Sequence, residues 1–398
     1  MDNTTPKSQI PRSQANDYSK DIIEERRQFL REKTGIELNH VNKYSFDPTI
    51  LPGNIEHFIV VAQVPIGITG PLLVNGEYAQ GEFYVPLATS EGTLVASYNR
   101  GMKIIRQCGG VTTTIQEEAM QRAPVFIFDN ARQARDFGIW LKEQFEEIKK
   151  QAESTTRTGK LITIEQYHAG RFVYTRFDYT TGDAAGQNMT GKATFTACEW
   201  IRKTHPLVKR YMIDGNFSTD KKHSTINVLR TRGKRVTAEI TIPEKIVREQ
   251  MNQSPARLQF YHNIGNLGSY FSGAVNNGSH SANGITALFI ATGQDAANVA
   301  EGSAAITYSE RTKEGDYYFS VVIPALIVAT HGGGTGLATQ RECLELMDCY
   351  GTGKVKKFAE IVAAAVLAGE LSLMSAMRVN KDGTSDWISS HDKLGRNR

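Results

Sequence analysis

The chain has 398 residues, of which 40% are hydrophobic and 22% are charged, and its formal net charge is +4. This balance is typical of a globular protein of two or three domains and argues against a dedicated nucleic-acid binder. Cys108, Cys198, Cys343 and Cys349 form no CxxC pair, which argues against a zinc site or a disulfide framework and favours a reduced, cytoplasmic chain.

The N-terminal region begins with polar residues, 1–19, that lack the apolar core of a secretory signal and are expected to be loose. A helix is predicted for residues 21–34, where isoleucine, phenylalanine and leucine recur at helical spacing before Gly35. Residues 64–89 indicate strands and turns, with a hairpin at the Asn-Gly pair 75–76. From Glu91 onward the pattern becomes helical.

An inserted module is predicted between residues 123 and 213. It reads as a strand (124–129), one long amphipathic helix (131–155), two strands (162–179) and a further helix (193–208). This order suits a small antiparallel sheet with helices on one face.

The second half of the chain alternates again. A strand is predicted at 235–243, a helix at 246–265 and glycine-rich helical stretches at 269–300. A last long helix is predicted at 356–377. Its most apolar run, 361–374, is interrupted by Glu370 and is shorter than the ~20 residues of a membrane span, so we expect a buried helix.

Two glycine-rich segments are candidates for ligand contact. The glycines at 332–334 would let the backbone approach a ligand closely, and a tight turn explains them equally well. The segment GDAAGQNM, at 182–189, could expose N–H groups to an anion at a helix start, although a plain strand-to-helix turn is the more ordinary interpretation. No GxGxxG follows a strand, so that type of dinucleotide fold has no support.

Several charged positions are candidates for chemistry, and each also has an ordinary explanation. Glu91 could donate a proton or simply complement a helix dipole. Asp295 could cap an element or place a charge in a site. His391 is either a solvated tail residue or part of a flap. Lys221 and Lys222 would ordinarily form a solvated basic turn, and they could instead hold a cation against developing negative charge.

The order of these segments resembles a known family. VPIGITGPL, ATSEGTLVASYNRG, GDAAGQNM, STDKK, ATGQDAANV, GGGTGLATQ and LAGELSLMSA resemble signatures of the 3-hydroxy-3-methylglutaryl-CoA reductases. The resemblance extends from about residue 52 to the C-terminus, and several matches in the right order are far more specific than any one of them.

The resemblance implies an α+β fold and a division of the chain. The parts are a polar and helical N-terminal segment (1–50), a large acyl-CoA-binding domain (51–122 and 214–377), an inserted ferredoxin-like domain that binds NADPH (123–213) and a mobile C-terminal flap (378–398). It also implies a homodimer with active sites at the subunit interface, no membrane anchor and no metal.

The family's chemistry implies a role for each catalytic candidate. The thioester is reduced to an alcohol by two hydride transfers, and each transfer places negative charge on the carbonyl oxygen. The resemblance implies that Lys221 stabilises this oxygen, that Glu91 protonates it and that Asp295 links both side chains. It implies that His391 protonates the departing CoA thiolate.

The same resemblance implies two sets of binding residues. Those for the cofactor are Thr156, Arg157, Asp183, Gly186, Gln187, Asn188, Gly332, Gly333 and Gly334. Those for the substrate are Ser97, Asn99, Arg100, Arg122, Asp214, Lys222 and Asn283. An arginine suits a phosphate group by its bidentate geometry, so Arg157 favours NADPH over NADH.

The chain departs from the family pattern at several positions. Asp214 stands where the family usually has a serine that bonds the substrate carboxylate, and Gly265 falls near a family lysine that also contacts this carboxylate. Ala185 and Gln187 replace methionines, and residues 378–386 lengthen the hinge before the flap. Arg122 and Lys222 still offer cations to an anion. The standard substrate therefore leads, with a different acyl-CoA or a catalytically degenerate binding homologue as alternatives.

Overall fold

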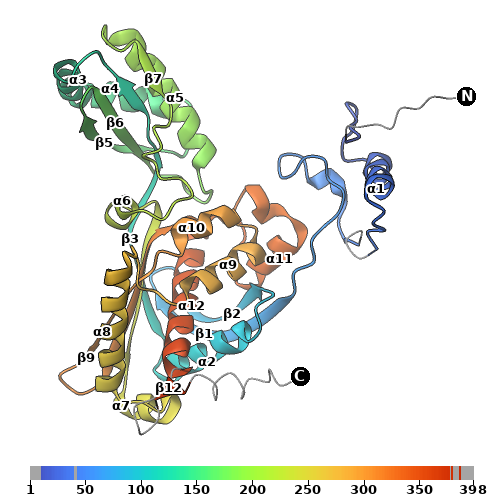
Figure 1. The fold of residues 1–398 in the computed structure, drawn as a ribbon, viewed down its shortest axis with the longest axis vertical. Coiled ribbons are helices and arrows are strands. Elements are labelled where there is room, and N and C mark those ends of the chain that lie inside the picture. Colours follow the sequence, from blue (N-terminus) through green and yellow to red (C-terminus); the bar gives the residue numbers. More distant parts are fainter. Residues whose placement is uncertain (1–9, 40–42, 377, 380–384, 387–398) are drawn as a thin grey trace, which may run out of the picture.

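The computed structural model describes residues 10–39, 43–376, 378–379 and 385–386 (Figure 1). An N-terminal segment stands to one side, a large body carries most of the sheet, and a smaller module projects from that body. Antiparallel strands and helices are both major components, so the predicted α+β class is confirmed.

The N-terminal segment is built around α1 (Lys20–Thr34), as predicted. Gly35 ends the helix in the left-handed conformation, with φ of 71°, and its N–H closes the last turn. The buried face of α1 packs against Phe58, which follows the short turn η1 (Pro48–Ile50). This packing gives the segment a small apolar core of its own.

The large body contains the sheet order β2-β1-β3-β8-β10-β9. All neighbours in this order are antiparallel except β1 and β3. The predicted hairpin is confirmed, since Asn75 pairs with Gln80 across the turn between β1 and β2. The elements of the body are β1 (Ile66–Gly76), β2 (Gln80–Ala88), α2 (Leu94–Gln107), β3 (Val111–Arg122), α6 (Thr225–Arg230), β8 (Gly233–Ile242), α7 (Glu244–Ile246), η2 (Val247–Met251), α8 (Pro255–Ser272), α9 (Ser281–Thr292), η3 (Ala296–Asn298), α10 (Val299–Gly302), β9 (Ile306–Arg311), β10 (Tyr317–Leu326), η4 (Gly333–Gly336), α11 (Ala338–Leu346) and α12 (Val355–Ala376).

The smaller module has a separate core formed by its own strands and helices. Its strands lie in the order β7-β4-β6-β5, and the last residues of β3 pair with β6, so β3 runs from the body into the module. The elements are β4 (Val125–Ile127), α3 (Ala131–Glu143), α4 (Phe145–Glu153), β5 (Leu161–Ala169), β6 (Phe172–Tyr179), α5 (Gln187–Thr204) and β7 (Arg210–Met212). The domain boundaries at residues 122 and 213 stay a prediction.

The prediction of one long helix over 131–155 is wrong. The chain turns at Gln144, with φ of −94° and ψ of 11°, and so divides the segment into α3 and α4. The break was hidden because the buried positions Phe137, Leu141, Ile148 and Ala152 keep helical spacing across it.

The prediction of one helix over 246–265 is also wrong. The π-helical turn η2 ends at Asn252, which has φ of 55°, and α8 then starts at Pro255. Proline has no N–H to donate inside a helix and is favoured in the first turn, where Ser254 caps Arg257. The sequence signal for this break was therefore present.

The last long helix, α12, is the centre of the large core, which confirms its prediction as a buried helix. By length and composition it could cross a membrane, but most of it is packed inside the protein. Its Glu370 accepts hydrogen bonds from the N–H groups of Ser279, His280 and Ser281, so the helix also fixes the loop before α9. The strands β11 (Arg378–Val379) and β12 (Ser385–Asp386) pair after it.

Candidate active site

Lys221, in the loop between β7 and α6, forms an ion pair with Asp295. Lys221 Nζ lies 3.0 Å from Asp295 Oδ2, and the two side chains are 44% and 39% exposed. The hydrogen bond to Asp295 raises the pKa of Lys221 above its ordinary value, which keeps the ammonium charged. Because the pair is open to solvent, a ligand can reach the Lys221 ammonium. The electrostatic interaction between them becomes stronger when the bound ligand excludes water.

The position of Asp295 depends on the turn that follows α9. Gly293 ends this helix with φ of 69°, and Asp295 Oδ1 accepts the N–H of Ala297 at 3.0 Å to start η3. A Cβ at Gly293 would lie 2.2 Å from the carbonyl oxygen of Gly334, so the close approach of these two turns requires glycine. Asp295 therefore both caps η3 and pairs with Lys221.

Glu91 lies in a different hollow from this pair. Its Oε1 accepts a hydrogen bond from Asn283 Nδ2 at 3.1 Å, and both residues line a cleft of about 430 Å³. Asn283 is in the first turn of α9, whereas Asp295 follows the last turn. A helix of 12 residues is about 18 Å long, so Glu91 and Lys221 lie at opposite ends of α9 in one chain.

The predicted cofactor turn lines a cleft of about 520 Å³. Gly186, with φ of 82°, precedes α5 and gives the first turn no side-chain cap. The N–H groups at a helix start carry partial positive charge, so an uncapped start suits a phosphate group. The cleft brings together the turn 184–189, the glycines 332–334 and Asp295.

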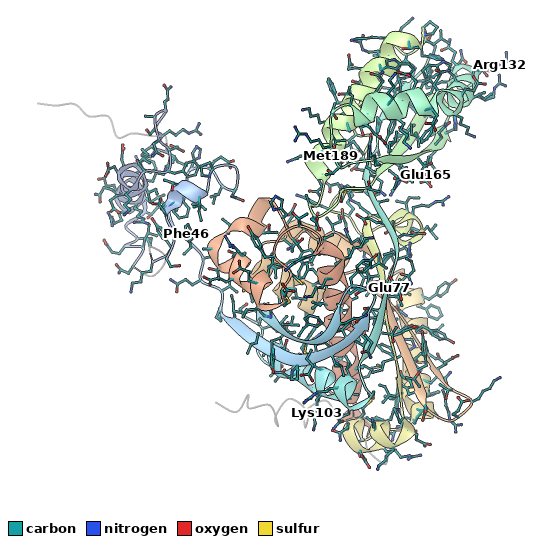
Figure 2. The ribbon with its side chains drawn as sticks, turned by 180° about the vertical axis from the view of Figure 1, so that it is seen from behind. Phe46, Glu77, Lys103, Arg132, Glu165 and Met189 are labelled. Carbon is teal, nitrogen blue, oxygen red and sulfur yellow. The ribbon has the colours of Figure 1, made fainter. Side chains whose placement is uncertain are left out.

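Gln187 connects this cofactor turn to the catalytic loop. Its Nε2 donates to Asp220 Oδ1 at 3.2 Å and to Asn298 Oδ1 at 3.3 Å. Met189, two residues further, lies at the base of the smaller module (Figure 2). The module and the body therefore meet at the candidate cofactor cleft.

The remaining predicted cofactor residues lie near this cleft without lining it. Thr156 Oγ1 accepts the N–H of Gly159 at 3.0 Å, and a Cβ at Gly159 would meet the Met189 side chain, so this turn lies against the cofactor turn. Arg157 is exposed in the same turn. The Asp183 carboxylate accepts N–H groups from the start of α12, at 2.8 and 3.2 Å, which is a structural contact.

The predicted carboxylate-binding arginine is already paired. Arg122 Nη1 lies 3.2 Å from Asp214 Oδ2, and Arg122 Nη2 donates to the carbonyl oxygen of Gln187 at 3.0 Å. Asp214 also accepts hydrogen bonds from Ser218 Oγ at 2.8 Å and from the N–H of Asn216 at 2.7 Å. The Asp214 carboxylate is therefore held by these three donors, and it occupies Arg122 with a carboxylate from the same chain.

Three predicted substrate residues on α2 take part in packing. Ser97 Oγ lies 2.9 Å from Ser372 Oγ, and Arg100 Nε donates to the same hydroxyl at 3.0 Å. Asn99 Oδ1 accepts the N–H of Gly70 at 2.8 Å. These contacts join α2 to α12 and to β1.

His280 is a residue that the sequence reasoning did not identify. It is buried beside Ser97, and burial together with Arg100 lowers its pKa to about 4, so it is neutral near pH 7.

Lys222 is exposed and donates to the carbonyl oxygen of Asp220 at 3.0 Å. His391 lies outside the described residues.

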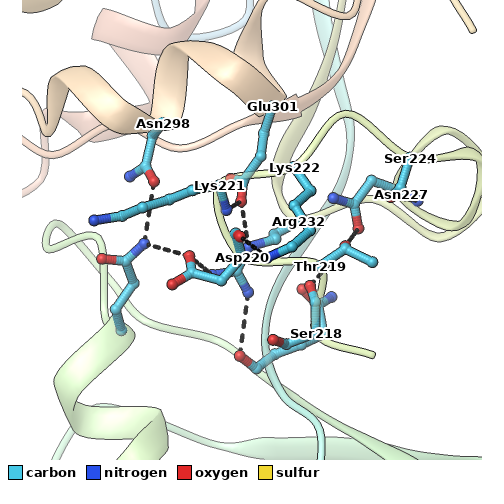
Figure 3. Close-up of polar contacts among 12 residues, drawn as sticks. Ser218, Thr219, Asp220, Lys221, Lys222, Ser224, Asn227, Arg232, Asn298 and Glu301 are labelled. Atoms are coloured by element: carbon cyan, nitrogen blue, oxygen red, sulfur yellow. Dashed lines mark hydrogen bonds and ion pairs between the residues drawn. The ribbon is translucent and has the colours of Figure 1, made fainter. Parts of the chain in front are cut away.

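A buried ion pair, also missed from the sequence, lies beneath Lys221. Arg232 Nε is 3.1 Å from Glu301 Oε1, and Arg232 Nη2 is 2.6 Å from Asp220 Oδ1 (Figure 3). Both Arg232 and Glu301 are almost fully buried. Burial raises the pKa of Glu301 to about 7, although Arg232 opposes this shift.

Within the described ranges, no three His, Cys, Asp or Glu side chains are grouped to hold a metal ion.

The sequence matches the family model of hydroxymethylglutaryl-coenzyme A reductase over residues 22–396. The chain belongs to this reductase family. A 3-hydroxy-3-methylglutaryl-coenzyme A reductase of Methanocaldococcus jannaschii is 46% identical over 385 residues, which is 95% of this chain and 94% of the relative. A protein of the same name from Methanothermobacter thermautotrophicus is 45% identical over 375 residues, or 93% and 92% of the two chains.

Solved structures agree with this assignment at the level of the fold. A class II reductase of the family from Streptococcus pneumoniae, bound to NADPH in open conformations, has a TM-score of 0.68 and 18% identity. The match covers 89% of this chain and 96% of that structure. The motif-based resemblance to the hydroxymethylglutaryl-CoA reductases is thus confirmed.

Proposed function

We propose that this chain reduces 3-hydroxy-3-methylglutaryl-CoA to mevalonate and free CoA with NADPH. The observation that carries the proposal is the Lys221–Asp295 ion pair beside the cleft lined by the cofactor turn. Relatives that are 45–46% identical over nearly their whole length carry the name of this activity. We also infer that the enzyme acts in the cytoplasm.

Lys221 has the chemistry that this reduction requires. When bound, NADPH supplies one hydride to each of two successive reductions. Each reduction leaves an alkoxide where the carbonyl oxygen was, and a fixed ammonium stabilises this oxygen more than it stabilises the neutral carbonyl. The pKa of Lys221 is raised by Asp295, so its charge is present at neutral pH.

Two proton donors complete the balance of two hydrides and two protons. Glu91 protonates the second alkoxide to give the alcohol. His391 protonates the CoA thiolate that leaves when the first alkoxide collapses, and it thereby prevents the thiolate from attacking the aldehyde.

Glu91 and Lys221 serve one site only if two copies of the chain meet. In one chain, the Glu91–Asn283 pair lies in the first turn of α9 and the Lys221–Asp295 pair lies beyond its last turn, and the helix rises about 14 Å from Asn283 to Thr292. We therefore infer a homodimer in which Glu91 of one copy faces Lys221 of the other.

The cofactor cleft fits a dinucleotide phosphate. The uncapped start of α5 at Gly186 would hold the pyrophosphate, and Gly332 and Gly333 have open space beside them. Arg157, exposed beside the cofactor turn, would bind the 2′-phosphate. In this assignment, residues 123–213 form the NADPH-binding domain.

The reaction has a stoichiometry that tests the proposal. Purified protein is mixed with hydroxymethylglutaryl-CoA and NADPH, and NADPH loss and free thiol are recorded together. We expect two NADPH oxidised per thiol released. The absence of turnover would indicate a binding homologue, and a ratio of one would indicate an aldehyde product, so either result overturns the proposal.

A second candidate is the reduction of an acyl-CoA that lacks the terminal carboxylate. The ion pair between Asp214 and Arg122, at 3.2 Å, favours it because the substrate carboxylate would have to compete with Asp214. The same assay with uncharged acyl-CoA thioesters separates the two candidates, since the second predicts a higher kcat/KM for the uncharged substrate.

A further inference from the structure

Lys221 is held at both of its ends by one short segment of the chain. Its ammonium meets Asp295, and its backbone N–H donates to Oε1 of Glu301, which lies six residues after Asp295. The short turns η3 and α10 make up this segment, so the acceptors of both bonds, Asp295 and Glu301, come from adjacent turns of the chain.

The backbone of Lys221 adopts a conformation that needs such support. Its φ is 57°, in the left-handed region that residues other than glycine seldom occupy. Thr219, two residues earlier, also has positive φ, and its hydroxyl donates to Asn227 Oδ1 at 2.7 Å. The loop is thus fixed on one side by Asn227 and on the other by Glu301.

Arg232 fixes Glu301 and the residue next to Lys221 at the same time. The arginine side chain is 1% exposed and contacts Glu301 Oε1 and Asp220 Oδ1. Its Nη1 donates to the carbonyl oxygen of Gln121, on β3, at 3.2 Å. Figure 3 shows Arg232 and Glu301 beside Asp220 and Lys221 of the loop. Because Glu301 is itself 1% exposed, it cannot touch a substrate and can act only through Lys221.

We propose that Glu301, oriented by Arg232, is a positioning residue that sets the place of the Lys221 ammonium through the backbone N–H of Lys221. The inference rests on the proposed role of Lys221. The decisive feature is the position of the acceptor oxygen, because both the Lys221 N–H and Arg232 Nε converge on Oε1. The negative charge of Glu301 is secondary in this account.

Two substitutions separate the position of the oxygen from its charge. Glu301→Gln keeps an acceptor oxygen at the same distance from the backbone and removes the charge. Glu301→Asp keeps the charge and withdraws the oxygen by one methylene. We expect kcat of Glu301→Gln to stay within about threefold of wild type and kcat of Glu301→Asp to fall about tenfold, since small displacements of a catalytic group are costly. KM for NADPH should change less than about twofold in both.

A matched control exists elsewhere in the body. Lys234, 3% exposed, pairs with Glu118 at 3.4 Å without contact to the loop, so Glu118→Asp should leave kcat unchanged. If Glu301→Asp does not fold, Arg232→Lys gives the same test, because one ammonium cannot reproduce the three contacts that Nε, Nη1 and Nη2 of Arg232 make with Glu301, Gln121 and Asp220. It should lower kcat with little change in KM.

The result that overturns the inference is a Glu301→Asp or Arg232→Lys enzyme with wild-type kcat, or a Glu301→Gln enzyme slower than Glu301→Asp. The second pattern would mean that the charge of Glu301, and not the position of its oxygen, determines kcat. Lys221→Ala is measured in parallel. If that variant remains active, the proposed role of Lys221 has failed, and this outcome is distinct from a failure of Glu301 alone.

Discussion

The Nζ atom of Lys221 lies 3.0 Å from Oδ2 of Asp295, and this hydrogen bond is the main reason why the pKa of the lysine is raised. Asp295→Asn should therefore lower the pKa of Lys221 and move the alkaline limb of the kcat–pH profile to lower pH. We expect kcat at neutral pH to fall about tenfold. Because the pair is exposed, the free energy of unfolding should change by less than about 1 kcal/mol. An unchanged alkaline limb would contradict the coupling.

The separation of Glu91 and Lys221 along α9 predicts complementation between inactive variants. Glu91→Gln and Lys221→Ala are each expected to be inactive as homodimers. If the two residues of one site come from different copies, a mixed dimer has one site with both changes and one intact site. Random re-association of equal amounts should then restore about a quarter of the wild-type activity. No recovery after verified subunit exchange would place both residues of a site in one chain.

The contact between Asp214 and Arg122 predicts a change in substrate affinity. Asp214→Ser removes the internal anion and leaves the guanidinium free to meet the substrate carboxylate. We expect KM for hydroxymethylglutaryl-CoA to fall about tenfold, in line with one charge-assisted hydrogen bond. KM for an acyl-CoA without the carboxylate should not change. Equal effects on both substrates would show that Asp214 acts on the loop and not on the carboxylate.

The elements with a local cause were predictable from the sequence. The helix stop at Gly35 follows from the backbone preference of a single residue. The Asn75-Gly76 pair predicted the hairpin, although both residues belong to β1 and residues 77–79 form the turn itself. The break before Pro255 has a local signal of the same kind, which the helical periodicity of the flanking residues obscured. The turn at Gln144 carries no such signal, and the apolar pattern continues through it.

The site was predictable only as far as its motifs extend. The order of the motifs identified Lys221 and Asp295, which the structure brings together. Arg232 and Glu301 are 69 residues apart in the sequence, and each alone resembles an ordinary surface charge. Their pairing comes from the packing of α10 against β10 and the adjacent start of β8, which no local pattern encodes. The pairing of Asp214 with Arg122 was missed for the same reason.

Burial of Glu301 predicts a pH-dependent stability. Its pKa is raised from 4.5 to about 7, so between these values the folded chain holds a proton that the unfolded chain has released. The contribution to stability is therefore fully present below pH 4.5 and is lost as the pH rises through 7, by about 3 kcal/mol in total. Glu301→Gln stays neutral and should lack this decline.

Urea unfolding at pH 5 and pH 8 measures the effect in both proteins. The wild type should lose more unfolding free energy between the two pH values than Glu301→Gln does. An equal loss in both would mean that Glu301 is ionised throughout this range.

The central claim is that the Lys221 ammonium stabilises the oxygen of the reacting carbonyl. It is tested most directly by kcat for NADPH-dependent reduction of hydroxymethylglutaryl-CoA in Lys221→Ala, beside Lys245→Ala, a change at an 82% exposed lysine remote from the loop. The account predicts a loss of at least about 100-fold for Lys221→Ala, with NADPH affinity unchanged, and no loss for Lys245→Ala. A Lys221→Ala enzyme that retains more than about a tenth of the wild-type kcat would contradict it.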